Sequence, residues 1–133
     1  MLNASTSADP EPFVRELIKR QFGAGLIKRR PFRLMFESSD KLVYVQNFNK
    51  KSEHLWYRVT ENPWNQMQSG KKDRWLCFTN PAERYAYIIP VSDVQTQLKR
   101  SAWNRSYLEV NIDPATHRWI ELDWNIAKYL LNM

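Results

Sequence analysis

The sequence predicts an α+β domain with a mainly antiparallel, strongly bent sheet or half-open barrel of about seven strands. Three observations support this class: alternating apolar and polar residues between short turn signals, an amphipathic helix near the start, and plentiful apolar side chains. Hydrophobic residues make up 43% of the 133 residues, and aromatic residues 14%. Strands joined by short turns favour antiparallel pairing.

A chain of this length matches one domain, which we place at residues 10–133 after a polar tail at residues 1–9. Three glycines leave no material for a flexible linker. The first residues lack the basic and apolar segments of a secretory signal, and no apolar run approaches the roughly 20 residues of a membrane helix. With Cys77 as the single cysteine, these features predict a cytoplasmic protein without a membrane partner.

The first half of the chain predicts one amphipathic helix, three strands and a second, short helix. Asp9 fits the cap of the first helix, Pro10 its first position and Gly23 its end. The three strands are predicted over residues 33–36, 42–48 and 55–60. Asn62 marks the start of the second helix, which we expect over residues 64–68.

The best-specified element is a hairpin of two strands at residues 75–79 and 84–89. A type I turn with Pro81 at its second position joins them. That loop length places Phe78 opposite Tyr85 on one face of the hairpin. Both faces are apolar, which is typical of strands at the centre of a sheet.

The last third of the chain predicts a helix, two strands and a C-terminal helix. Ser92 and Gln95 form a capping box for a helix that ends near Arg100. Strands are predicted over residues 107–112 and 119–124, and alternation places Trp119 on the polar face of the second. The final helical stripe consists of Ile126, Tyr129, Leu130 and Met133. This element order is compatible with the seven-stranded pseudobarrels of B3-type DNA-binding domains, a likeness in element order and not in motifs.

The sequence lacks the motifs of most enzyme classes. Its two histidines, His54 and His117, lie far apart without the spacing of a metal site. Three glycines exclude a phosphate-binding loop or a dinucleotide fold. No Asp or Glu precedes a Lys by two positions, as nucleases of the PD-(D/E)xK type require. Cys77 lies in an apolar stretch, where a thiol behaves as a small buried hydrophobe, so we predict no cofactor and no bound metal.

One acidic group could nevertheless support catalysis. If residues 112 and 118 pair, Glu109 and Glu121 face each other and Asp123 lies beside them. Opposed like charges destabilise a sheet unless they are solvated or share a cation. A shared metal would make the domain a nuclease, with Glu37 and Asp40 as a second candidate pair. A solvated face with a slightly offset register explains the same pattern, and we favour it.

Positive charge is concentrated in part of the chain, whose net charge is +6. Residues 17–33 sum to +6, whereas residues 1–16 and 106–133 each sum to −2. The residues predicted to contact phosphate are Lys28, Arg29, Arg30, Arg33, Lys50, Lys51, Lys71, Lys72 and Arg74. In an up-down-up meander, the first four and Lys50-Lys51 would meet at one end of the sheet. A solvated basic surface without a partner is the alternative.

Aromatic residues supply a second ingredient of nucleic-acid binding. Trp56 shares a strand face with Arg58, so these two are candidates for base contact. We therefore predict a non-catalytic nucleic-acid-binding domain, for DNA rather than RNA. Aromatic residues and Arg are also enriched at protein interfaces. A protein-interaction or homo-oligomerisation domain is the first alternative, and a divergent metal-dependent nuclease the second.

Overall fold

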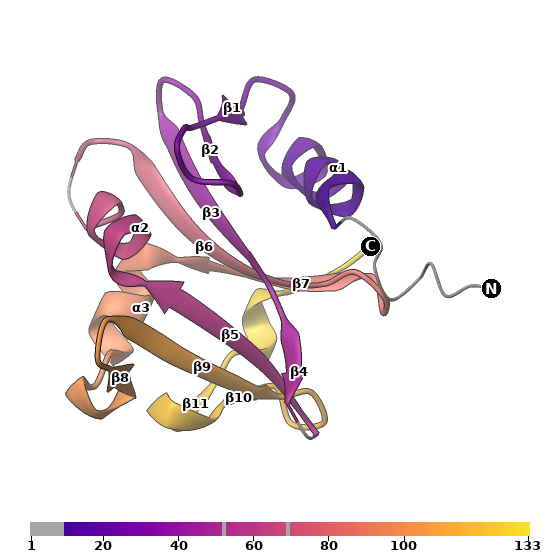
Figure 1. Ribbon diagram of the computed structural model, residues 1–133. Helices are drawn as coiled ribbons and strands as arrows, with labels where there is room; N and C mark the ends of the chain where they lie inside the picture. Colours follow the sequence, from indigo (N-terminus) through magenta and orange to yellow (C-terminus); the bar gives the residue numbers. More distant parts are fainter. Residues whose placement is uncertain (1–9, 52, 69) are drawn as a thin grey trace.

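The computed structural model describes residues 10–51, 53–68 and 70–133, with the backbone alone at 49–51 (Figure 1). It confirms the predicted α+β class, with mainly antiparallel pairing in two sheets that do not close into a barrel. The predicted polar tail at residues 1–9, with the Asp9 cap, lies outside the described residues. The N-terminal helix α1 (Glu11–Phe22) follows Pro10, one residue later than predicted.

The first sheet has the strand order β1-β2-β3-β6-β7-β12. Its strands are β1 (Ile27–Lys28), β2 (Met35–Glu37), β3 (Lys41–Asn47), β6 (Asp73–Asn80), β7 (Tyr85–Pro90) and β12 (Leu130–Asn132). All neighbours are antiparallel except β3 and β6, which run parallel. The chain between β3 and β6 leaves this sheet, forms part of the second and returns through a helix. The predicted up-down-up order of the first three strands is kept, but its placement in a single sheet is wrong: β2 pairs with β3 in the first sheet, and the continuation of β3 pairs with the third predicted strand in the second.

The second sheet has the order β11-β10-β9-β5-β4, and β8 also pairs with β9. Its strands are β4 (Asn49–Lys51), β5 (His54–Thr60), β8 (Trp103–Asn104), β9 (Tyr107–Asp113), β10 (Arg118–Trp119) and β11 (Trp124–Asn125). Phe48 alone separates β3 from β4, so one extended stretch belongs first to one sheet and then to the other. Figure 1 shows this stretch descending from β3 into β4.

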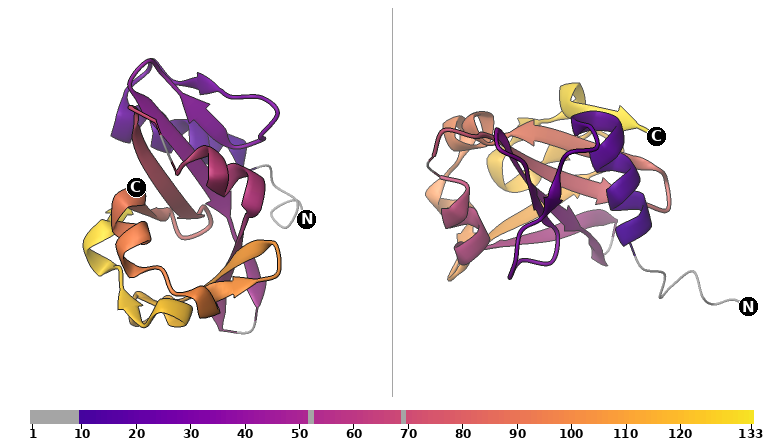
Figure 2. Two further views of the ribbon diagram at one scale, coloured as in Figure 1. Left: turned by 90° about the vertical axis from the view of Figure 1, so that its left-hand side faces the viewer. Right: turned by 90° about the horizontal axis from the view of Figure 1, so that it is seen from above.

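Two apolar clusters fill the molecule because strand side chains alternate between faces. Val14, Leu17 and Ile18 of α1 cover one face of the first sheet, where they cluster with Val43 and Val45. Figure 2 shows α1 against this sheet, with the second sheet on the other side. The larger cluster lies between the sheets and includes Leu42, Leu76, Phe78, Tyr57, Val59, Leu108, Val110 and Trp119.

The predicted internal helices are present, but the capping box is wrong. They are α2 (Glu61–Gln66) and α3 (Val91–Gln97). Pro90 takes the N-cap position of α3, so Ser92 lies inside the first turn and makes no capping hydrogen bond. None of the helices in the described part of the chain is both long and apolar enough to cross a bilayer.

The central hairpin forms with a register two residues away from the predicted one. Phe78 pairs with Tyr87, and Asn80 pairs with Tyr85. Asn80 extends the pairing of the two strands because it is buried and its side chain is hydrogen-bonded. Its amide donates to the Tyr85 hydroxyl, and its carbonyl accepts from the Glu83 backbone N–H. A shift of two residues keeps every side chain on its expected face.

The C-terminal part differs most from the prediction. Trp119 pairs with Ile112, one residue away from the predicted register, and is fully buried instead of facing the polar side. The second strand ends there because the 3-10 helix η3 (Ile120–Leu122) follows. The predicted C-terminal helix is wrong: the 3-10 helix η4 (Ala127–Tyr129) leads into β12.

β12 forms because the edge of β7 offers unpaired backbone groups. Leu130 packs against the cluster between the sheets, and Leu131 against the cluster under α1. The Tyr129 hydroxyl donates to Asp93 Oδ2 at 2.7 Å, which ties this segment to α3. Burial and then this bond raise the pKa of Tyr129 to about 12.

Trp119→Ala tests the observed register of β10. Removing a fully buried ring should lower the free energy of unfolding by about 3–5 kcal/mol, measured by chemical denaturation. Ile27→Ala is the control, because Ile27 is 68% exposed and its truncation should cost within about 0.5 kcal/mol. If both substitutions cost equally little, Trp119 faces solvent as the sequence pattern predicted.

Candidate functional site

The loop at residues 29–34, between β1 and β2, is the most basic segment whose side chains the structure describes in full. Backbone hydrogen bonds hold both ends: Arg29 N donates to Met35 O at 2.7 Å, and Val45 N donates to Leu34 O at 2.9 Å. The loop therefore lies against the middle of β3. It carries Arg29, Arg30 and Arg33 at the surface.

Arg29 contributes to a cavity of about 360 Å³, which we call the basic cavity. It is lined by Arg29, Leu42, Asn65, Gln66, Gly70, Lys71, Lys72 and Arg74. Four of these are cations and none is an acid. Arg29 Nη2 donates to Gln66 Oε1 at 2.7 Å, and Arg74 Nη1 donates to the Met67 carbonyl at 2.9 Å. Both guanidinium groups are thereby fixed in position.

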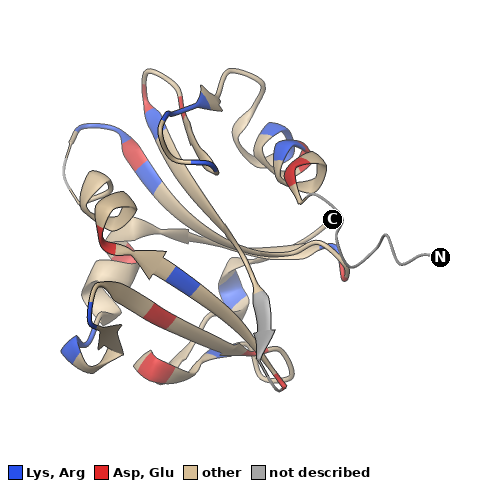
Figure 3. Ribbon diagram, viewed as in Figure 1, with Lys and Arg blue, Asp and Glu red and all other residues tan. Residues whose placement is uncertain are grey.

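Figure 3 shows the same arrangement in the ribbon. Basic positions follow the chain from β1 into the loop and recur at the start of β6, where one acidic position, Asp73, separates Lys72 from Arg74. Segments about 40 residues apart in sequence thus supply one positive surface.

One carboxylate partly balances the basic cavity. Glu37 Oε1 lies 2.9 Å from Lys72 Nζ and 3.8 Å from Arg29 Nη1. The three side chains are 28–34% exposed, so such pairs contribute about 0–1 kcal/mol to stability. Lys71 has no ion-pair partner among the described residues. One acid for four cations leaves the cavity positive.

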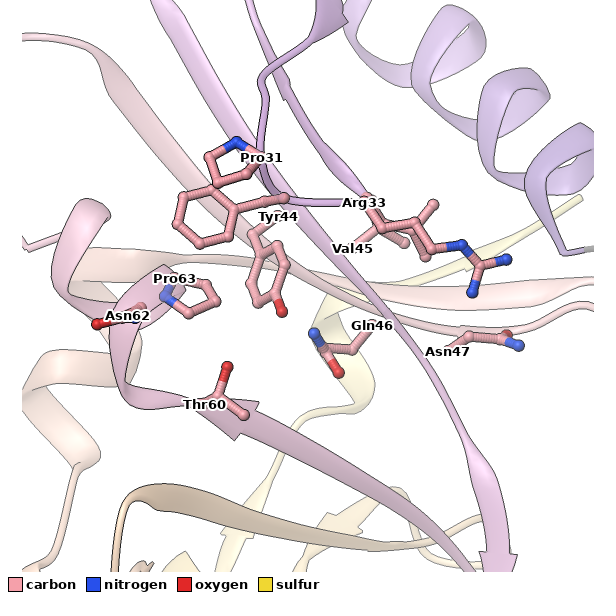
Figure 4. A pocket seen from close by; sticks show the side chains of 11 residues that line it. Pro31, Arg33, Tyr44, Val45, Gln46, Asn47, Thr60, Asn62 and Pro63 are labelled. Atoms are coloured by element: carbon pink, nitrogen blue, oxygen red, sulfur yellow. The ribbon is translucent and has the colours of Figure 1, made fainter.

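A second cavity, of about 470 Å³, opens where β3 and β5 diverge, and we call it the inter-sheet cavity (Figure 4). It is lined by Pro31, Phe32, Arg33, Leu34, Tyr44, Val45, Gln46, Asn47, Thr60, Asn62 and Pro63. The Tyr44 hydroxyl, the Gln46 amide and the Thr60 hydroxyl point toward one another in it. Tyr44 is 8% exposed, and burial raises its pKa, although hydrogen bonds with Gln46 and Thr60 offset part of the rise.

The same two elements border both cavities. The loop provides Arg29 to the basic cavity and Pro31 to the inter-sheet cavity. Helix α2 provides Gln66 to the first and Asn62 to the second. A third hollow, of about 470 Å³, lies on the loop itself and includes Lys28, Arg30 and Arg33. The three form one basic, grooved surface.

Three of the predicted phosphate-contacting residues differ from the expectation: Lys28 lines the hollow on the loop but is ion-paired, and Lys50 and Lys51 belong to another sheet. Lys28 Nζ donates to Glu11 Oε1 at 2.6 Å, so its charge is paired and lowers the pKa of Glu11. Lys50 and Lys51 belong to β4 in the second sheet, and their side chains lie outside the described residues. Extended chain at about 3.3 Å per residue covers about 25 Å between Leu42, beside the basic cavity, and Lys50, and about 16 Å between Val45, which the loop contacts through Leu34, and Lys50. The expectation that these segments meet at one end of a single sheet is wrong.

Trp56 and Arg58, the predicted base contacts, share the outer face of β5. The Arg58 guanidinium lies 5.1 Å from the Trp56 ring centre and 4.3 Å from the Tyr107 ring centre. The same face ends at Thr60, which lines the inter-sheet cavity. Trp56 and Arg58 therefore line neither cavity, but they lie on the same face of β5 as Thr60, which lines the inter-sheet cavity.

The acidic group is separated into individual contacts. In the observed register Glu109 pairs with Arg58, not with Glu121. Glu121 accepts hydrogen bonds from the Asn111 backbone and amide, and Asp123 lies 2.6 Å from Arg118. The conditional opposition of the two glutamates does not occur, because Trp119, and not Arg118, pairs with Ile112; the slightly offset register that we favoured is confirmed.

The other candidate catalytic residues also have separate structural partners. Glu37 pairs with Lys72, whereas Asp40 accepts from Ser38 in the β2–β3 turn, and this bond lowers its pKa. His117 Nδ1 lies 2.6 Å from the Tyr87 hydroxyl. Within the described residues, no three His, Cys, Asp or Glu side chains are grouped so as to hold a metal ion.

Comparisons with protein-family models, curated proteins and solved structures found no match, so the geometry carries the functional argument. It adds four residues that the sequence did not indicate: Tyr44, Gln46, Thr60 and Gln66. Thr60 could have been predicted from the sequence, because it follows Trp56 and Arg58 on the same face of an alternating strand. The other three meet their neighbours only through pairing between distant segments.

Inorganic phosphate should bind the basic cavity and stabilise the fold. At equal ionic strength, replacing chloride by phosphate should raise the melting temperature by about 3–5 °C, which corresponds to about 1 kcal/mol of binding free energy. The measurement is thermal unfolding followed by circular dichroism. The double substitution Lys71→Ala and Lys72→Ala should abolish the difference, whereas an unchanged difference would place the bound anion elsewhere.

Proposed function

We propose that this domain binds nucleic acid, DNA in the first place, and does not catalyse a reaction on it. The observation that carries the proposal is the basic cavity, in which Arg29, Lys71, Lys72 and Arg74 converge from two distant segments without an acid in the lining. Phosphate contacts by Lys and Arg dominate the affinity of nucleic-acid-binding proteins.

The extent of the positive surface favours a polymer over a single phosphorylated small molecule. Arg30 and Arg33 continue it along the loop beyond the basic cavity. Cations arranged along a groove match the repeated phosphates of a strand, whereas one phosphate would need a single convergent cluster. The Arg29–Gln66 hydrogen bond holds the loop against α2 and supports a pre-arranged track.

The placement of the acids supports binding rather than hydrolysis. Glu109 faces Arg58, Glu121 caps the Asn111 backbone and Asp123 pairs with Arg118. A hydrolytic metal centre needs carboxylates that converge on one point.

We further propose a cytoplasmic location, since Cys77 is a free, buried thiol whose pKa is raised by burial.

Protein interaction is the second candidate, and one feature favours it. Ile27 is 68% exposed on the edge strand β1, beside a groove that is lined by Ile18, Leu26 and Phe36 together with the cations Arg15 and Lys19. Edge strands with exposed apolar residues can pair with another chain. A stable dimer in solution that ignores salt and nucleic acid would favour this function.

A titration of duplex and single-stranded DNA at several salt concentrations tests the proposal. Affinity should fall with salt, at a log–log slope near −0.9 per phosphate contact on duplex. Lys71→Ala with Lys72→Ala should weaken binding and reduce the slope by about 2 on duplex. Lys99→Ala with Lys128→Ala is the matched control, because it removes the same charge away from the cavity. Equal losses in both double variants would refute a specific role for the basic cavity.

Glu37→Gln should strengthen binding. The substitution keeps the shape of the side chain but frees Lys72 and Arg29 from their shared carboxylate. We expect a gain in DNA affinity of about 3–10-fold at low salt, shrinking as salt rises. The unfolding free energy should change by less than about 1 kcal/mol, since the pairs are partly exposed. Glu16→Gln, which frees Arg84 at another surface, is the control; weaker binding by Glu37→Gln would contradict the proposal.

A further inference from the structure

We propose that the inter-sheet cavity receives one unstacked base of a single strand whose phosphates lie along the basic cavity. This inference rests on the proposed function and deepens it by specifying what part of the nucleic acid each cavity takes. The two cavities differ in chemistry: one is lined by four cations, the other by neutral polar and apolar side chains with Arg33 as the one charged residue in its lining.

The size and walls of the inter-sheet cavity suit a planar ring. Its volume of about 470 Å³ lies within the range of about 300–1,000 Å³ that small-molecule sites occupy. Phe32 and Tyr44 contribute aromatic rings, while Pro31 and Pro63 contribute flat apolar surfaces from opposite sides, the loop and α2. Unpaired bases bind by stacking on such surfaces.

The polar groups in the cavity match a base rather than a phosphate. The Tyr44 hydroxyl, the Gln46 amide and the Thr60 hydroxyl point toward one another between β3 and β5 (Figure 4). Each can both donate and accept hydrogen bonds. The pairing edge of a base presents donors and acceptors side by side, whereas a phosphate presents acceptors alone.

The surroundings of the cavity suit a strand that passes over it. On one side Gln66 of α2 holds Arg29 at the basic cavity, and on the other the face of β5 runs from Thr60 to Arg58 and Trp56. At about 3.3 Å per residue, Trp56 lies about 13 Å from Thr60 along the strand. A duplex keeps its bases paired inside, so a cavity of this kind selects an unpaired or extruded base.

An abasic DNA strand and the same strand with one central thymine test the inference in binding titrations with the full chain. The thymine should strengthen binding roughly tenfold, as one stacked and hydrogen-bonded base contributes. Equal affinity for both strands would overturn the inference while leaving the proposed function intact. If neither strand binds but duplex DNA does, the inference fails and the proposed function stands; if duplex DNA does not bind either, both fail.

Two sets of substitutions separate the roles of the cavities. Gln46→Ala with Thr60→Val should abolish the gain from the thymine without changing the affinity for the abasic strand. Lys71→Ala with Lys72→Ala should weaken both strands and preserve the gain. Asn132→Ala, on the opposite edge of the first sheet, controls for loss of an amide, and unfolding midpoints verify that each variant is folded. An unchanged gain in the first double variant would overturn the inference.

Discussion

The passage of one strand between two sheets is the constraint on which the rest of the structure depends. β3 pairs with β2 and β6 in the first sheet, and after Phe48 the same extended chain pairs with β5 in the second. Two sheets that share a strand must diverge on one side of it. The apolar faces close the narrow side, and the wide side remains as the inter-sheet cavity.

Aromatic rings hold this divergence in place. Tyr57 of β5 packs against Phe48 at the junction and against Phe78 of β6, and Phe78 packs in turn against Trp119. The Tyr57 hydroxyl donates to the Thr79 carbonyl at 2.9 Å, which joins the two sheets with a buried hydrogen bond. Rigid contacts at the closed side let polar side chains at the open side keep fixed positions, as a binding site requires.

Local patterns in the sequence predicted the parts of the fold that local physics determines. Helix α1, the two strands of the central hairpin and the alternation of β9 follow from spacing alone. The register and turn of the hairpin do not, because Arg84 N donates to Pro81 O and Pro81 is therefore the first residue of the turn, not the second. The parallel pairing of β3 with β6 could not be predicted, because the chain between them leaves the sheet and no local signal records where it returns. Trp119 was misplaced since a register shift of one residue exchanges the two faces of a strand. At the C-terminus, apolar residues with helical spacing instead pair with the free edge of β7.

The candidate site likewise combines features that local sequence predicted with features that depend on pairing between distant segments. The sequence identified the cations at residues 28–33 and 71–74 but paired the first group with Lys50 and Lys51, which the parallel crossover carries away from it. What brings Arg29 to Lys72 is the position of β6 beside β3, with Glu37 between them.

The hydrogen bond from Arg29 to Gln66 connects the two cavities mechanically. The loop and α2 each line both cavities, so a change in the distance between them alters both at once. A phosphate bound at Arg29 would accept hydrogen bonds from the same guanidinium that donates to Gln66. Because the guanidinium has five N–H donors, it can donate to both acceptors at once. With both acceptors bound, the Arg29 guanidinium would hold the loop against α2 and fix Pro31 and Pro63 in the wall of the inter-sheet cavity. Under the proposed function, the electrostatic contact with phosphate would thus prepare the inter-sheet cavity, in whose lining Arg33 is the one charged residue, to receive a base.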